Sequence, residues 1–377
     1  MMKKRFRIYA LIIAVCFLSI SFIGCGGESA GYKVVLQKID AEFDFHTDFQ
    51  KAYLEDHYSV IGLYANGKAE KSIPEALGIG WSAKATGGMT EKISGYTVKL
   101  GTDKKFTKNV REYRTSETFA DVYNLMSGYT YYCAVEAETE SGKTYLSETS
   151  TFRTTANAPR NLYIEGVTNM RDLGGWQTES GVKVKQGLLY RCGRLNESNT
   201  SQIKVEITEN GKKEMLDYLG ITTEIDLRLV KNNEVGGLTD TSPLGESVNY
   251  VQCPMNYNVS NYITGNAEEL VKVFEILSDI DNYPIIYHCN IGTDRTGMIS
   301  FLVNGLLGVD EEDLYRDFLF SNFGNIGGSR SISNIQNNYL NYVQSFDGDK
   351  LSDKIYRCLV ANGVPSENLD EIMNIML

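Results

Sequence analysis

A cysteine and an arginine lie close together in the segment YHCNIGTDRTG, residues 287–297, with five residues between them. Cys289 offers a thiol and Arg295 a guanidinium, and the intervening loop contains Gly292. A thiolate is a strong nucleophile, and a guanidinium donates a fork of hydrogen bonds that suits two oxygens of one phosphate group. These residue types at this spacing predict nucleophilic attack on an anion that the same loop binds.

The residues on either side favour an anion-binding loop. YPIIYHC is a short apolar run that predicts a strand, and TGMISFLVNGLLG predicts a helix. A loop that joins a strand to a helix N-terminus turns its N–H groups inward, and the helix dipole adds positive potential. Gly292 permits the backbone conformation that this loop needs. The predicted substrate-binding residues are Asn290, Ile291, Gly292, Thr293 and Thr296.

The predicted chemistry is attack on a phosphate monoester, followed by hydrolysis. The positive field of the loop is expected to lower the pKa of Cys289, so that a thiolate persists at neutral pH. Its attack gives a phosphocysteine, and water then releases phosphate. Asp294 is the nearest acid in the sequence and the candidate proton donor to the leaving oxygen. Thr296 can hydrogen-bond the thiolate and support it as a leaving group.

Segments beyond the loop strengthen this prediction. The loop resembles that of the cysteine-dependent protein tyrosine phosphatases, and more narrowly the bacterial secreted members whose loop reads His-Cys-x-x-Gly-Lys-Asp-Arg-Thr-Gly. NMRDLGG, LLYRCGRL, EIDLRLVKNNEV and LVANGVPSENLDEIMNIML resemble other segments of that family, in the expected order, across nearly all of residues 160–377. The resemblance implies Cys289 as the nucleophile, Arg295 as the phosphate clamp and Asp294 as the general acid.

One loop position departs from the family. The family's lysine is Thr293 here, and in the family that lysine accompanies activity on phosphoinositides. The formal net charge is −11, and it becomes about −15 without residues 1–24, which hold four basic residues and no acid. Such a surface repels nucleic acid and anionic lipid. The missing lysine and the acidic surface both disfavour phosphoinositides, which remain an alternative substrate. No nucleic-acid partner is expected.

Several polar residues nearby have a structural interpretation as well as a functional one. We expect His288 to hold the loop rather than to act as a base. Asp172 is an alternative acid, or else a turn cap paired with Arg171. Arg228 and Glu234 are expected to form an ion pair beneath the site. The histidines number three and lack ligand spacing, so neither a metal nor a cofactor is predicted.

The sequence leaves open the roles of two arginines and of one Gly/Ser/Asn-rich segment. Arg191 and Arg194 could add positive potential at the site, or could be packed and paired. The segment NFGNIGGSRSISN, residues 322–334, reads as a loop that either covers the site or lies on the surface.

Strands alternate with helices across residues 160–377, which predicts an α/β phosphatase-like domain with a mainly parallel sheet flanked by helices. Residues 32–155 instead contain short β-branched and aromatic runs that predict an all-β sandwich. LMSGYTYYCAVEA, with Tyr131, resembles the tyrosine-corner strand of fibronectin type III domains, and Trp81 would then be its core tryptophan. The segment 57–80 is longer than such a domain needs and has no predicted place.

The N-terminus reads as an export signal. Residues 1–24 are basic and then apolar, and a small residue precedes Cys25, which resembles a bacterial lipoprotein signal. Cys25 would carry the lipid, and residues 25–31 would form a tether. The alternative is a transmembrane anchor. Either interpretation places the folded part outside the cytoplasm, at a membrane surface.

The leading function is therefore an exported, membrane-tethered phosphatase that acts on phosphotyrosine in proteins or peptides. The second is a phosphatase of phosphoinositides or inositol phosphates. The third is a phosphate-binding interaction module without turnover, against which the intact Cys289, Arg295 and Asp294 argue.

Overall fold

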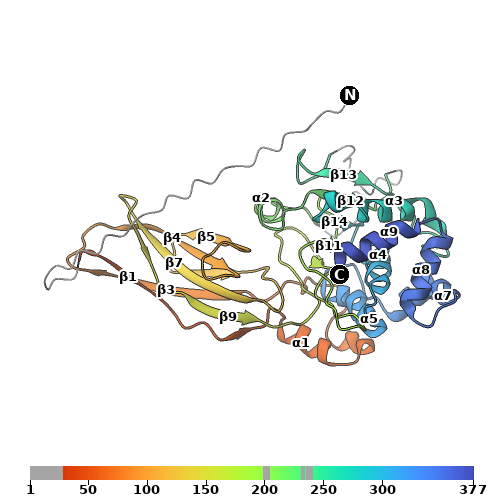
Figure 1. The fold of residues 1–377 in the computed structure, drawn as a ribbon, viewed down its shortest axis with the longest axis horizontal. Coiled ribbons are helices and arrows are strands. Elements are labelled where there is room, and N and C mark those ends of the chain that lie inside the picture. The colour runs from red at the N-terminus through yellow and green to blue at the C-terminus, as the bar shows by residue number, and fades with distance from the viewer. Residues whose placement is uncertain (1–28, 198–203, 231–233, 235–240) are drawn as a thin grey trace.

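The computed structural model describes residues 29–197, 204–230, 234 and 241–377. The predicted signal at 1–24, its Cys25 and most of the predicted tether lie outside the described residues. The molecule is elongated, with a β part at one end and an α/β part at the other (Figure 1). Within the described ranges, no helix has the length and apolar character needed to cross a bilayer.

The β part consists of two sheets whose inner faces share one core. One sheet is antiparallel and contains β1 (Gly31–Leu36), β3 (Leu77–Thr86) and β6 (Phe119–Val122). The other contains β2 (Glu42–Phe43), β9 (Ser150–Thr154), β7 (Thr130–Thr139), β4 (Ile93–Gly101), β5 (Arg111–Thr115) and β8 (Thr144–Leu146). Apolar residues alternate with polar ones along these strands, so each sheet buries one face.

The two aromatic residues singled out in the sequence lie in this core. Trp81 and Tyr131 are both buried. The hydroxyl of Tyr131 accepts a hydrogen bond of 2.8 Å from the N–H of Met126, which ties the start of β7 to the chain just before it. The likeness to fibronectin type III domains stays a prediction.

The segment between β2 and β3 belongs by its packing to the α/β part. It forms α1 (Asp48–Glu55) and the 3-10 turn η1 (Tyr58–Leu63). Tyr53, Ile61 and Ala65 are buried in the same core cluster as the apolar residues of the C-terminal half. Figure 1 shows α1 beside α5, below the helical part and away from the long strands. Residues assigned by sequence to the span of the β domain therefore complete the other core.

The α/β part contains a five-stranded sheet in the order β10-β11-β14-β12-β13. Its strands are β10 (Arg171–Asp172), β11 (Leu189–Cys192), β12 (Thr223–Asp226), β13 (Asn249–Gln252) and β14 (Ile285–His288). Strands β11, β14, β12 and β13 run parallel, and β10 is antiparallel to β11. The predicted mainly parallel sheet is confirmed, and β14 is its central strand.

Helices surround this sheet (Figure 1). They are α2 (Glu209–Lys213), α3 (Ala267–Leu277), α4 (Asp294–Leu306), α5 (Glu311–Phe320), α6 (Ile332–Ile335), α7 (Asn341–Val343), α8 (Leu351–Ala361) and α9 (Ser366–Met376). Short 3-10 or π turns are η2 (Glu214–Tyr218), η3 (Thr264–Asn266), η4 (Ile280–Asn282), η5 (Ser321–Phe323) and η6 (Gln336–Leu340).

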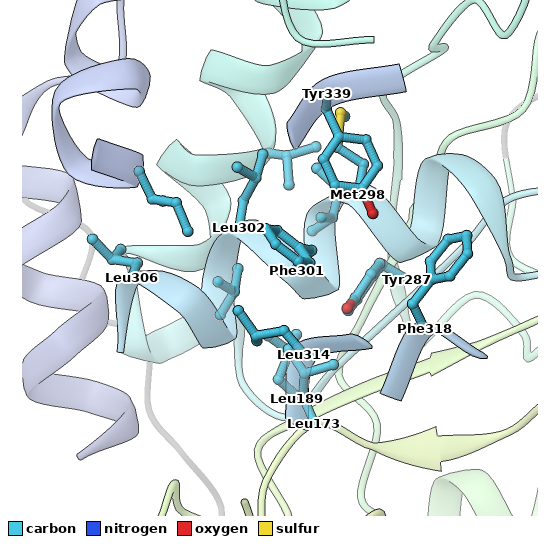
Figure 2. Packing of buried hydrophobic residues seen from close by; sticks show 14 of the residues in the cluster. Leu173, Leu189, Tyr287, Met298, Phe301, Leu302, Leu306, Leu314, Phe318 and Tyr339 are labelled. Atoms are coloured by element: carbon cyan, nitrogen blue, oxygen red, sulfur yellow. The ribbon is translucent and has the colours of Figure 1, made fainter. Parts of the chain in front are cut away.

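Helix α4 is the buried axis of this part. Every residue from Arg295 to Leu306 is buried, as expected for a helix that is not amphipathic and packs on all sides. Figure 2 shows Met298, Phe301 and Leu302 among side chains from the sheet and from neighbouring helices. The hydroxyls of Tyr287 and Ser300 are 2.6 Å apart, which joins β14 to α4. The loop between them is therefore fixed at both ends.

A buried arginine joins the β part to the α/β part. Arg160 donates 2.7–2.9 Å hydrogen bonds to the carbonyls of Asn124 and Leu125, and its third nitrogen forms an ion pair with Asp172. Gln186 and Ser127 exchange two more hydrogen bonds, each 2.9 Å long. These polar contacts therefore join the β part to the α/β part.

Candidate active site

Cys289 directly follows the carboxyl end of β14, where ligands bind on parallel sheets. Helix α4 begins five residues later, at Asp294. The thiol is nearly enclosed, since only 2% of the residue is exposed. The predicted strand, loop and helix around this cysteine are all present.

Buried cations and an amide hold the carbonyl groups of the loop outward. The carbonyl of Asn290 accepts 3.2 Å hydrogen bonds from the backbone N–H and the guanidinium of Arg194. The carbonyl of Gly292 accepts bonds of 3.0 Å from the Asn169 amide and 2.8 Å from Arg191. The opposite side of each peptide therefore faces the thiol. Arg191 and Arg194 are fully buried, so their observed role is in packing and pairing.

The N–H groups of residues 290–293 donate to no described residue, so they are available as a cradle for an anion. Gly292 has φ of +68°, and a Cβ there would lie 2.3 Å from the carbonyl oxygen of Cys192. No side chain fits this position. The Thr293 side chain is buried and contacts the Asn169 amide and the carbonyl of Ile291, so this residue offers a ligand its N–H rather than its hydroxyl.

The environment of the thiol favours its ionised form. Burial alone raises the pKa of Cys289, but the positive charge of Arg295 and donation from Thr296 outweigh it, and the net shift is downward. The charge of Asp294 opposes this shift only weakly. Among the described residues the buried Thr296 hydroxyl has no other hydrogen-bond partner, so its proton is available to the thiolate.

Arg295 is oriented by a carboxylate. Glu234 accepts two hydrogen bonds of 2.9 Å, one from each terminal nitrogen of the guanidinium. The carbonyls of Leu227 and Met255 accept two more, each 3.1 Å. The Nε–H of Arg295 donates to no described residue and stays available for a phosphate oxygen. The expected pairing of Glu234 with Arg228 was therefore wrong.

Arg228 instead pairs with Asp226, at 2.7 Å, within a buried network under the loop. His288 lies 2.8 Å from Glu224 through Nε2 and 3.2 Å from the carbonyl of Cys289 through Nδ1. Burial lowers the pKa of His288, but the carboxylates of Asp226 and Glu224 raise it more. His288 thus contacts the loop backbone and two carboxylates, as expected for a structural residue.

Glu224, Asp226 and His288 are close enough to one another to bind a metal ion. Their ligand atoms are already engaged, however. Glu224 accepts from Ser242 and contacts His288, and both oxygens of Asp226 accept from Arg228. The cluster fits a hydrogen-bond network better than a metal site.

Asp172 does not reach the loop. It accepts a 2.8 Å bond from the N–H of Gly174, as a turn cap, but its ion-pair partner is Arg160 at 2.7 Å. The predicted partner, Arg171, contacts Asp317 and the side chain of Asn169 instead. An acid this enclosed and paired has no path to a leaving group.

Asp294 lies at the edge of the site and has one strong partner. Arg330 donates to both of its carboxylate oxygens, at 2.8 and 2.9 Å. Tyr257 lies over the Arg295 guanidinium, 5.0 Å from its centre. The pKa of Tyr262 is raised to about 12, chiefly by burial, with a contribution from the charge of Asp294. Sequence analysis singled out the segment 322–334 as one that could cover the site, and its Arg330 does reach Asp294. It did not name Arg330 itself and missed Tyr257 and Tyr262, since no local motif marks them.

A family model described as the tyrosine phosphatase family matches residues 162–374, more than half of the chain. This match places the chain in a family of phosphatases. More narrowly, the chain belongs to the tyrosine phosphatase family.

Individual relatives are distant. A Cupriavidus necator protein, provisionally named a tyrosine-protein phosphatase, is 23% identical over 186 residues. The match covers 43% of this chain and 63% of that relative's length. The core catalytic domain of the PP-IP phosphatase SIW14 from S. cerevisiae is 18% identical, with a TM-score of 0.28, over 48% of this chain and 91% of that one. The twitchin kinase region from C. elegans is 16% identical, with a TM-score of 0.17, over 35% and 20%.

We predict that Thr296→Val raises the pKa of Cys289, because it removes a donor to the thiolate. The rate of alkylation by iodoacetamide should rise with pH around a midpoint below the ordinary thiol value of about 8.5. The thiolate dominates above that midpoint, so the variant should need a higher pH for the same rate. Thr296→Ser keeps a hydroxyl and serves as the control; an unchanged midpoint in Thr296→Val would contradict the assignment.

The other described cysteines should not obscure this measurement. Burial raises the pKa of Cys133, Cys253 and Cys358 to about 12, and that of Cys192 well above its ordinary value. Peptide mapping of the alkylated protein should therefore find label at Cys289 first.

Proposed function

We propose that this protein hydrolyses phosphotyrosine in proteins or peptides, through a phosphocysteine intermediate at Cys289. The observation that carries the proposal is a thiol with a lowered pKa inside a cradle of unpaired N–H groups. A phosphate dianion in that cradle would have its phosphorus near the sulfur, with the Nε–H of Arg295 donating to one of its oxygens.

The reaction has two steps. The Cys289 thiolate forms the sulfur–phosphorus bond while the bond from phosphorus to the tyrosine oxygen breaks, and that oxygen takes a proton. Water then attacks phosphorus, the sulfur–phosphorus bond breaks, and the thiolate leaves with inorganic phosphate as the other product. The N–H cradle and Arg295 stabilise the charge on the equatorial oxygens in both steps.

Asp294 is the proposed proton donor. The loop between β13 and α3, residues 253–266, supplies Tyr257 and Tyr262 beside the site but contains no aspartate or glutamate. Asp294 is near enough for its charge to act on the thiol of Cys289. An acid on the catalytic loop itself therefore takes the role that this neighbouring loop cannot fill.

Arg330 favours a second candidate function. It places another cation near the thiol, in a chain whose loop has Thr293 at the position of the family's lysine. A soluble inositol phosphate or a phosphoinositide carries several phosphates and could use both cations. Phosphotyrosine remains the leading substrate, since the strongly acidic chain disfavours an anionic lipid surface.

We further propose that the protein is exported and held at the outer face of a bacterial membrane by a lipid on Cys25. The support is the sequence of residues 1–25 alone, with its basic start, apolar stretch and small residue before the cysteine.

The first prediction concerns the nucleophile. Cys289→Ser should abolish release of phosphate from a phosphotyrosine peptide, because an alcohol is not ionised at neutral pH. Cys358→Ser, in α8, is the matched control and should retain activity. Rapid acid quench with a labelled peptide should trap phosphate on Cys289. Turnover that survives in Cys289→Ser, or a preference for phosphoserine, would overturn the proposal.

A second prediction concerns the proton donor. Asp294→Asn should lower kcat on phosphotyrosine by about 10²- to 10⁴-fold, the usual contribution of a general acid. The loss should be much smaller with p-nitrophenyl phosphate, whose leaving group needs no proton. Asp349→Asn changes an exposed aspartate and is the control. Equal losses on both substrates would show that Asp294 acts otherwise.

The third prediction tests the lipid anchor. Mass spectrometry of the N-terminal peptide from membranes should find acylated Cys25 as the first residue, and Cys25→Ser should lack the lipid. Cys16→Ser should not change it, because Cys16 lies within the predicted signal. Mature protein that keeps residues 1–24 would favour the transmembrane anchor instead.

A further inference from the structure

Arg330 and Asp294 form the one two-pronged ion pair that we find at the edge of the described site. Nε and one terminal nitrogen of Arg330 each donate to a different oxygen of Asp294, at 2.8 and 2.9 Å. Both side chains are about one-fifth exposed, 21% for Arg330 and 22% for Asp294. Solvent, and therefore a substrate, can reach this pair, whereas Cys289 and Arg295 are almost enclosed.

The backbone of Arg330 is held firmly although its side chain reaches toward solvent. The amide of Asn322, in η5, accepts from the Arg330 N–H at 2.7 Å and donates to its carbonyl at 3.1 Å. Asn322 is itself buried. A fixed backbone beneath a partly exposed side chain lets the guanidinium change partner without a rearrangement of the fold.

The segment between β2 and β3 braces the same loop. The carbonyl of Gly67 accepts 3.0 Å hydrogen bonds from the N–H groups of Ile326 and Gly328, and its own N–H donates to the carbonyl of Asn322 at 2.8 Å. A Cβ on Gly67 would lie 2.4 Å from the Gly328 carbonyl oxygen, and φ there is +70°. A segment far away in sequence therefore positions the loop that carries Arg330.

The titratable groups around Asp294 come from five elements. Arg330 faces it from the loop before α6, Tyr262 from the loop before α3, and Tyr339 from η6. Cys289 and Arg295 belong to the catalytic loop and α4. Of these groups, Arg330 alone donates hydrogen bonds to the carboxylate among the described contacts.

This resting arrangement conflicts with proton donation. A carboxylate whose two oxygens both accept from one guanidinium has neither oxygen placed to donate to a leaving group. The conflict disappears if another anion takes the guanidinium. An arginine fork fits a carboxylate or a phosphate equally well, so a second anionic group on the substrate could replace Asp294.

We propose that Arg330 determines specificity by binding a second anionic group on the substrate, beside the scissile phosphate, and that its transfer from Asp294 to this group releases Asp294 to serve the leaving oxygen. The proposal deepens the proposed function and rests on it for the role of Asp294. The substrate class is a phosphotyrosine peptide with an acidic side chain adjacent to the phosphotyrosine. A phosphate ester without a second anion leaves the ion pair intact and is a poorer substrate.

The experiment compares two phosphotyrosine peptides that differ only in having aspartate or asparagine next to the phosphotyrosine. Wild-type protein should prefer the aspartate peptide by about tenfold in kcat/KM, the size expected for one charge-assisted hydrogen-bonded pair at a part-exposed site. Arg330→Gln should reduce this preference to about twofold or less, and Arg330→Lys should keep part of it. An unchanged preference in Arg330→Gln would overturn the proposal.

Arg316→Gln is the matched control. Arg316 is 21% exposed, as Arg330 is, and is paired with Asp313 and Glu312 on its own helix. Its replacement should leave the peptide preference unchanged. Turnover of p-nitrophenyl phosphate, together with its loss in Cys289→Ser, reports the proposed function separately. If the expected peptide preference is not found while p-nitrophenyl phosphate is still hydrolysed through Cys289, only the role of Arg330 is refuted.

A double-variant comparison tests the release of Asp294. On the asparagine peptide, Arg330→Gln should raise kcat severalfold, because Asp294 no longer has its partner. The gain should vanish when Arg330→Gln is made in the Asp294→Asn protein, as interacting residues are not additive. An equal gain in both backgrounds, or a fall in kcat, would show that the ion pair does not restrain Asp294. If Arg330→Gln impairs a soluble inositol bisphosphate but not the aspartate peptide, the peptide class is wrong.

Discussion

The outward orientation of two carbonyl groups is the constraint on which the rest of the site depends. If the carbonyls of Asn290 and Gly292 turned inward, they would repel a phosphate and the thiolate alike. Arg194, Arg191 and Asn169 hold them outward with hydrogen bonds. Because each peptide is planar, anchoring its oxygen on one side aims its N–H at the other. Side chains on the far side of the loop from the thiol therefore orient the N–H groups of the anion cradle.

The donors behind the loop are charged and buried, so they need partners of their own. Asp317, on α5, forms ion pairs with Arg171 at 2.8 Å and Arg191 at 2.7 Å. Burial raises the pKa of Asp317, but the two guanidinium groups outweigh it and keep the carboxylate ionised. Removing one member of such a cluster leaves an unpaired buried charge. Helix α5 therefore stabilises the loop through the β10–β11 edge of the sheet.

The same reasoning applies to the mouth of the site, with a different outcome. Arg295 has a buried partner, Glu234, that stays with it and leaves its Nε free for a phosphate. Arg330 has a partly exposed partner, Asp294, for which a substrate group can substitute. Burial separates a permanent ion pair from an exchangeable one, since solvent access lowers the free energy needed to part the charges.

Local signals in the amino-acid sequence were enough to predict the strand, loop and helix around Cys289, the mainly parallel sheet, and the closeness of Arg295 and Asp294 to the thiol. These features follow from short-range hydrophobic periodicity and from Gly292, which permits the backbone conformation that the loop needs. The ion pairs depend on the tertiary structure, since the sequence around an arginine does not indicate which carboxylate it will contact. In the folded chain Arg295 pairs with Glu234 and Arg330 with Asp294, and α1 and η1 pack against the catalytic core. These contacts join residues distant in sequence, so they depend on the fold of the whole chain.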